Sequence, residues 1–190
     1  MIHGANGTGA AFAPLAGELR ARGHEVVAPD LPIEDRDATF ADYAATVPGG
    51  DVIVGHSMGG VTASLVARRD GARVVYVAAL LPQAGVALKA QFVEMMCPGV
   101  ARALARRDGL DFWTDAASFG LDPTSMRGQS LAPYFDALEA AVPGRYVVCA
   151  RDRVVAPAYQ RSVPMESFEL DCGHDAFRER PADVADLLGA

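Results

Sequence analysis

Residues 51–60 read Asp51-Val-Ile-Val-Gly-His-Ser-Met-Gly-Gly60 and combine a strand, a sharp turn and the start of a helix. Residues 51–54 are typical of a short buried strand, and residues 61–69 are typical of a helix. Ser57 lies between them, with a glycine two residues before it and another two residues after it. Gly-x-Ser-x-Gly between a strand and a helix predicts a serine nucleophile held on a strained turn above the edge of a sheet.

The same turn predicts how a developing negative charge would be stabilised. The N–H of Met58 would point into the space above the Ser57 hydroxyl, and the helix N-terminus adds partial positive charge there. In this arrangement a second N–H comes from the loop after the first strand. The sequence His3-Gly4-Ala5 lies in that loop. We therefore expect Ala5 and Met58 to form an oxyanion hole, with His3 bracing the loop through hydrogen bonds.

A serine nucleophile needs a base, and His174 is the best candidate among four histidines. It follows the predicted last strand, residues 167–171, so it would lie at the same sheet edge as Ser57. The other histidines fit structural roles better. We interpret His24 as a solvated turn residue and His56 as pointing away from Ser57.

The base in turn needs a carboxylate that fixes its tautomer and stabilises the imidazolium. Asp152 follows the predicted strand at residues 145–150 and would lie at the same edge. Asp171 and Asp175 are closer to His174 in sequence, but one ends its strand and the other is adjacent to the histidine. The chain order Ser57, Asp152, His174 is the order expected of such a site.

Strands and helices alternate along the chain and predict a parallel sheet covered by helices on both faces, an α/β fold. The predicted strands are residues 24–30, 51–54, 73–80, 145–150 and 167–171. The predicted helices are residues 10–22, 37–46, 61–69, 131–141 and 181–189, and residues 151–161 should form a loop with a short helix. We expect residues 1–190 to form one domain.

Residues 83 to about 130 lack strand alternation and contain many aromatic and methionine side chains. We interpret this segment as a small helical lid inserted above the site. Its apolar side chains would then line a substrate pocket together with the loop residue Asn6. The candidate substrate-binding residues are Asn6, Phe92, Met96 and Trp113.

Composition limits the partners of the chain. The formal net charge is −7 and no basic cluster stands out, which argues against nucleic acid and anionic membranes because phosphate binding needs grouped Lys and Arg. The longest apolar run, residues 74–81, is too short to span a bilayer. The sequence leaves open whether the chain forms a homodimer.

The three cysteines are Cys97, Cys149 and Cys172, and no Cys-x-x-Cys occurs. An odd number without a spacing pattern predicts neither a disulfide framework nor a zinc site. Free thiols suit a reducing compartment, and no export signal is visible at the N-terminus. We therefore expect a cytoplasmic protein.

Stretches spread over nearly the whole chain are similar to one known family. They are His3-Gly4-Ala5, Gly23-His-Glu-Val-Val-Ala-Pro-Asp-Leu-Pro32, Val54-Gly-His-Ser-Met-Gly-Gly60, Val77-Ala-Ala-Leu-Leu-Pro82, Tyr146-Val-Val-Cys-Ala-Arg-Asp152 and Gly173-His174. In these stretches the chain resembles the α/β-hydrolase fold, in particular the carboxylesterase branch that includes plant methyl-ester hydrolases and hydroxynitrile lyases. The resemblance implies a Ser57/Asp152/His174 triad, no metal or cofactor, and an acyl-enzyme route on small esters.

The chain departs from that family at its start and in its lid. Only Met1 and Ile2 precede His3-Gly4, where the family usually has a full strand. We therefore expect a sheet short of one element, or a start that is internal to a longer protein. The lid is shorter than usual, and Asn6-Gly-Thr-Gly9 replaces the aromatic residues that commonly follow His-Gly.

Two other classes of function fit parts of the sequence. Gly4-x-x-Gly7-x-Gly9 followed by Asp30 resembles a dinucleotide turn of a reductase, but the spacing differs from Gly-x-Gly-x-x-Gly. The Tyr-x-x-x-Lys pair of short-chain reductases is also absent, since residue 85 is glycine. A hydroxynitrile lyase or a ligand receptor on the same fold is the other alternative. A lyase would be expected to use a lysine near the site, and Lys89 is the only lysine.

Overall fold

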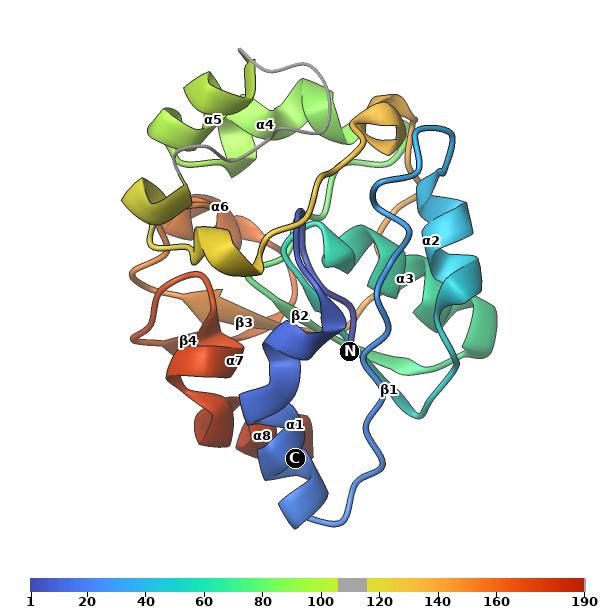
Figure 1. Cartoon of the computed structure of the whole chain (residues 1–190), viewed down its shortest axis with the longest axis vertical. Helices are drawn as coiled ribbons and strands as arrows, with labels where there is room; N and C mark the ends of the chain where they lie inside the picture. The colour runs from blue at the N-terminus through green and yellow to red at the C-terminus, as the bar shows by residue number, and fades with distance from the viewer. Residues whose placement is uncertain (106–115, 190) are drawn as a thin grey trace.

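The computed structural model describes residues 1–105 and 116–189 (Figure 1). Within them, four parallel strands form one sheet in the order β1-β2-β3-β4. The strands are β1 (Val52–His56), β2 (Arg73–Val77), β3 (Arg145–Cys149) and β4 (Glu166–Leu170). The parallel sheet confirms the predicted fold class, and each of these strands lies where a strand was expected.

Successive side chains along each strand point to opposite faces of the sheet, so the core has two layers. One layer packs against α2 (Phe40–Thr46) and α3 (Gly59–Asp70), and its strand residues are Ile53, Val74, Tyr76, Tyr146 and Val148. The opposite layer packs against α1 (Ala13–Ala21), α7 (Ala176–Glu179) and α8 (Pro181–Gly189), and its strand residues are Val54, Val75, Val77, Val147 and Cys149. Figure 1 shows these two groups of helices on either side of the sheet. The strands β1, β2 and β3 are thus buried on both faces, as their apolar residues predict, whereas the edge strand β4 is largely exposed.

Local sequence signals set the ends of several helices. Thr39 caps α2: its hydroxyl accepts a hydrogen bond from Asp42 N–H at 3.2 Å, and the Asp42 carboxylate accepts one from Thr39 N–H at 2.8 Å. The helix predicted from residue 37 therefore begins at Phe40. Gly71 ends α3 with φ of +67°, a conformation that glycine adopts without steric cost. The predicted helix at 10–22 is a 3-10 helix, η1 (Gly9–Phe12), followed by α1.

The strand predicted at residues 24–30 does not form. Among the described residues, the only pairing on that side of β1 is a parallel bridge at Ile2, whose N–H donates to Val54 O at 2.8 Å and whose C=O accepts from His56 N–H at 3.0 Å. The Met1 amino group donates to Val27 O at 2.7 Å. A single residue lies between β1 and residues 24–30, so residues 24–30 form no strand ladder with the sheet. A groove lies between β1 and residues 24–30.

The helix predicted at residues 131–141 is also wrong. Only a 3-10 helix, η5 (Ala132–Phe135), forms there, and the chain leaves it at Asp136 in an extended conformation. Ala137 then makes an antiparallel bridge to Ala87, and Val142 N–H donates to Ser64 Oγ at 2.8 Å. Tertiary pairing of the main chain has overridden the helical pattern of the sequence.

The described residues of the segment predicted as a lid include short helices over the carboxyl ends of the strands (Figure 1). They are η2 (Leu88–Gln91), α4 (Phe92–Met95), α5 (Pro98–Ala105), η3 (Ala116–Phe119) and η4 (Pro123–Ser125). The short helix expected within residues 151–161 is α6 (Pro157–Ser162), which packs on β3. No helix among the described residues is long and apolar enough to cross a membrane.

The capping box of α2 gives a stability prediction. Replacing Thr39 by Ala should lower the free energy of unfolding by about 1 kcal/mol, because the N–H of Asp42 loses its acceptor. Urea unfolding followed by circular dichroism measures the change. Thr39→Ser keeps a hydroxyl and should stay close to the parent chain; equal stability of the Ala and parent chains would contradict the capping role.

Candidate active site

Ser57 occupies the sharp turn that its flanking glycines predicted. Its φ is +54°, in the left-handed region that non-glycine residues rarely adopt. The turn is held from both sides, because Ser57 N–H donates to Val77 O at 3.1 Å and Leu80 N–H donates to Ser57 O at 2.9 Å. Such strain persists only where the surroundings enforce it and is frequent at functional sites.

Two glycines make this turn sterically feasible. A Cβ on Gly55 would lie 2.5 Å from Ala63 Cβ and 2.8 Å from Gly59 O. A Cβ on Gly59 would overlap the main-chain carbonyls of Ile2 and His3. The close approach of β1, α3 and the first loop therefore needs hydrogen in place of a side chain at both positions.

The first loop brings Ala5 next to Ser57. The main chain passes so close at Gly4 that an added Cβ would lie 2.8 Å from Ser57 Cβ. His3 braces the loop as expected, since its Nδ1 donates to Gly4 O at 2.8 Å and its Nε2 accepts from Leu31 N–H at 3.0 Å. Within the described part of the chain, the N–H groups of Ala5 and Met58 donate to no other residue. Both residues line the cavity that contains Ser57.

The structure brings Asp152 and His174 together. His174 Nδ1 donates to Asp152 Oδ2 at 2.8 Å, and the Asp152 side chain is completely buried. The same carboxylate accepts from Val154 N–H at 2.7 Å and Val155 N–H at 3.1 Å through Oδ1, and from Gln160 Nε2 at 2.8 Å through Oδ2. With four donors in fixed positions, the carboxylate can orient the imidazole without moving.

The pairing also sets the charge behaviour of His174. Burial opposes its protonation, but the negative charge of Asp152 and the hydrogen bond to it outweigh burial and raise the pKa of His174 above its ordinary value. Since Nδ1 carries the proton shared with Asp152, Nε2 holds the lone pair of the neutral ring. That nitrogen is the one able to act as a general base.

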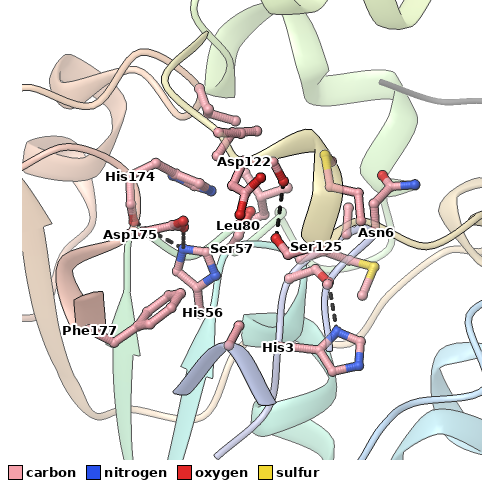
Figure 2. Close-up of a pocket in the computed structure, with 18 of the residues that line it drawn as sticks. His3, Asn6, His56, Ser57, Leu80, Asp122, Ser125, His174, Asp175 and Phe177 are labelled. Atoms are coloured by element: carbon pink, nitrogen blue, oxygen red, sulfur yellow. Dashed lines mark hydrogen bonds and ion pairs between the residues drawn. The ribbon is translucent and has the colours of Figure 1, made fainter. Parts of the chain in front are cut away.

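Ser57 and His174 line one cavity, and Figure 2 shows the His174 ring extending into it. No hydrogen bond joins the Ser57 hydroxyl to His174 among the described residues. Hydrogen bonds of catalytic pairs are often long without substrate and shorten in the reacting complex.

His56 has a role that the sequence did not indicate. Its Nε2 donates to the main-chain oxygen of His174 at 3.0 Å, and the two rings lie 4.5 Å apart (Figure 2). The Phe177 ring packs edge-on against the His56 ring, and the centres of the two rings lie 4.9 Å apart. Burial and the neighbouring His174 keep the pKa of His56 well below its usual range. His56 is therefore a neutral support of the His174 loop.

Gln160 on α6 is a second residue that the sequence did not reveal. It is completely buried, and its Oε1 accepts from Cys149 N–H at 2.8 Å. Its Nε2 donates to Asp152 and to Val155 O. Gln160 thus ties the end of β3 to the carboxylate, and no spacing rule in the sequence singles it out.

The cavity above Ser57 is small and mostly apolar. Its volume is about 70 Å³. Of the predicted substrate-binding residues, Asn6, Phe92 and Met96 line it, while Trp113 lies outside the described residues. Further apolar lining residues are Ala11, Leu80, Leu121, Met126, Tyr134, Val154 and Phe177, and the charged lining residues are Asp122, Asp175 and Arg178.

The residues behind the alternative functions have other partners. Gly9 N–H donates to Asp30 Oδ1 at 2.6 Å, so the carboxylate that a reductase would use for a ribose is engaged by the glycine-rich loop itself. Lys89 Nζ lies over the Phe135 ring, 4.3 Å from its centre, and is absent from the described cavity wall. In the part of the chain that the structure describes, no group of three or more His, Cys, Asp or Glu side chains could hold a metal ion.

A matched pair of glycine substitutions tests the packing of the turn. Gly55→Ala should lower the free energy of unfolding by about 2–3 kcal/mol, because the new methyl overlaps Ala63 and Gly59. Gly17→Ala places a methyl in open space on α1 and should raise it by about 0.5–1 kcal/mol. Both follow from thermal or urea unfolding, and equal effects at the two sites would refute the steric assignment.

Comparison with known proteins places these features in one family. The family model described as "Alpha/beta hydrolase family" matches residues 1–187. The chain is 23% identical to a pyrethroid hydrolase of Sphingobium wenxiniae, in an alignment covering 99% of this chain and 85% of that protein.

Solved structures share the fold. A pyrethroid hydrolase from Sphingobium faniae superposes with a TM-score of 0.71 at 23% identity, over 99% of this chain and 94% of the other. A polyneuridine aldehyde esterase variant gives a TM-score of 0.74 at 20% identity, over 98% and 96%. With a family model matched along nearly its whole length, the chain belongs to the α/β-hydrolase family.

Proposed function

We propose that this protein is a serine hydrolase that cleaves small carboxylic esters through an acyl-enzyme intermediate. The observation that supports it most is the hydrogen bond between His174 and a fully buried Asp152, made beside the strained turn that carries Ser57. A histidine oriented in this way is suited to remove a proton from a serine. The small apolar cavity is suited to a short acyl or alkoxy group.

The proposed reaction proceeds in two halves. Ser57 Oγ attacks the ester carbonyl carbon while His174 Nε2 takes the hydroxyl proton, and the N–H groups of Ala5 and Met58 stabilise the negative oxygen. The ester C–O bond then breaks, and His174 returns the proton to the leaving alcohol. A water molecule attacks the acyl-enzyme in the same way, which releases the carboxylic acid and restores Ser57.

The relatives give this proposal its class. Two of the similar proteins are named as a pyrethroid hydrolase and a polyneuridine aldehyde esterase. We propose that this chain also hydrolyses an ester, and we do not propose that it acts on the particular substrates of those proteins. Asn6, Phe92 and Met96 line the cavity and are the proposed substrate contacts.

Ser57→Ala tests the nucleophile. With 4-nitrophenyl acetate or butyrate as substrate, the variant should lose at least about 10³-fold in kcat/KM, because no other group supplies the attacking oxygen. Ser162→Ala is the matched control, since Ser162 is an exposed serine of α6 outside the cavity. Retention of the parent rate in Ser57→Ala, with the same folded spectrum, would disprove the proposal.

The pairing of His174 with Asp152 predicts the pH profile. The base must be neutral, so kcat/KM should fall as pH decreases through the raised pKa of His174, with a midpoint above the 6.5 of an unperturbed imidazole. Asp152→Asn removes the charge that raises this pKa. It should move the midpoint to lower pH and reduce the rate by roughly 10³–10⁴-fold. A profile that stays flat down to pH 5 in the parent enzyme would exclude His174 as the base.

A further inference from the structure

Residues 127–130, which we call the strap, run from the lid across the loop that carries Ala5. The strap meets that loop at Asn6, which is buried. Arg127 N–H donates to Asn6 O at 2.8 Å, and Asn6 Nδ2 donates to Arg127 O at 2.7 Å. Asn6 N–H donates to Gln129 Oε1 at 3.1 Å. Three of the polar groups of Asn6 are therefore bound to the strap.

Gln129 is held firmly on the other side. Its side chain is completely buried, and its Nε2 donates to the Tyr43 hydroxyl at 3.4 Å and to Ser130 O at 3.2 Å. Ser130 N–H donates to Ile33 O at 2.7 Å, which fixes the strap to the core. Because Nε2 faces these oxygens, Oε1 is directed to the N–H of Asn6.

The conformation of Asn6 explains why this contact matters. Gly7 N–H donates to Gly4 O at 3.2 Å, so residues 4–7 form a four-residue turn with Ala5 and Asn6 at its centre. Asn6 has φ of +57° and Ala5 has a negative φ, the combination of a type II turn, which usually has glycine at the third position. After glycine, asparagine is the residue that adopts this conformation most readily, so the sequence favours the turn, but the turn still needs support from its neighbours. A buried N–H of Asn6 without an acceptor would cost free energy. That cost would favour rotation of the peptide between Ala5 and Asn6 away from its present orientation.

We propose that Gln129 is a positioning residue of the oxyanion hole. Its Oε1 holds the N–H of Asn6, and through it the turn that carries Ala5 N–H next to Ser57. The inference rests on the proposed function, since it assigns a role to the oxyanion donor of that reaction. A displacement of about 1 Å in a catalytic group can reduce a rate on the order of 10²-fold, so a contact outside the cavity can control turnover.

Gln129→Met tests the contact, because methionine fills a similar volume without an acceptor. The variant should lose about 10- to 100-fold in kcat with KM within about 3-fold, since the oxyanion forms only in the transition state. Its Ki for an alkyl trifluoromethyl ketone, which mimics the tetrahedral intermediate, should rise by the same factor as kcat falls. Tyr43→Phe removes one of the two oxygens that Gln129 Nε2 binds, keeps the Asn6 contact and the bond to Ser130 O, and should retain the parent kcat.

A second variant and one measurement on the parent protein test the inference if Gln129→Met does not fold. Gln129→Asn withdraws the acceptor while keeping an amide, and it should show the same selective loss of kcat. In the parent protein, hydrogen exchange resolved to Asn6 should show an amide strongly protected from solvent. An Asn6 amide that exchanges like that of an unstructured peptide would overturn the assignment.

The outcomes separate this inference from the proposed function. Ester turnover that depends on Ser57, with kcat unchanged in the Gln129 variants, would overturn only the role of Gln129. Equal losses in kcat and in stability for Gln129→Met and Tyr43→Phe would also overturn it, because the role would then be structural. Absence of Ser57-dependent turnover in the parent chain would refute the proposed function, whatever the exchange of Asn6.

Discussion

The structure depends on one crowded crossing, where β1 ends, α3 begins and the first loop passes over both. Ser57 lies at this crossing in a left-handed conformation, and Gly55 and Gly59 leave the room that the neighbouring main chain occupies. The crossing has two consequences. It places Ser57, Ala5 and Met58 in the wall of one cavity, and it leaves the N–H groups of Ala5 and Met58 without protein partners in the described part of the chain.

The remaining polar groups of the site form two supports that meet above the sheet. In one support, Asp152 follows β3 and binds His174, and Gln160 of α6 binds Asp152. The other is the strap, which holds Asn6 from the lid. His56 joins the turn that carries Ser57 to the His174 loop, because its Nε2 donates to the main-chain oxygen of His174. The proposed catalytic groups thus lie on segments that hydrogen bonds to other parts of the chain hold in place, as pre-organised catalysis requires.

The sequence predicts those parts of this protein that depend on local steric and periodic patterns. The glycines around Ser57, the apolar strands and the strand ends at Asp152 and His174 follow from steric and periodic patterns. The strand predicted at residues 24–30 failed because forming it requires a neighbouring strand, and in the described part of the chain β1 is paired on that side at Ile2 alone. The helix predicted at residues 131–141 failed because the chain there makes a bridge from Ala137 to Ala87, and Val142, the residue after this segment, bonds to Ser64.

Gln129, Gln160 and His56 were missed for the same physical reason. Gln129 and His56 act through hydrogen bonds to residues far away in the chain, such as the contact between Gln129 and Asn6 across 123 positions. Gln160 binds Cys149, Asp152 and Val155, which are close in sequence but follow no recurring spacing. A buried glutamine has no characteristic spacing, so its partner cannot be deduced before the fold is known. Supports of a site are therefore harder to find in a sequence than the groups they support.

Covalent labelling tests whether Ser57 is the activated nucleophile that we propose. A fluorophosphonate should react once per chain, and mass spectrometry of the digested adduct should locate the phosphonate on Ser57. The reaction should slow when His174 is protonated at low pH, since the hydroxyl then lacks a base. An unmodified chain at neutral pH, or an adduct on a residue other than Ser57, would contradict it.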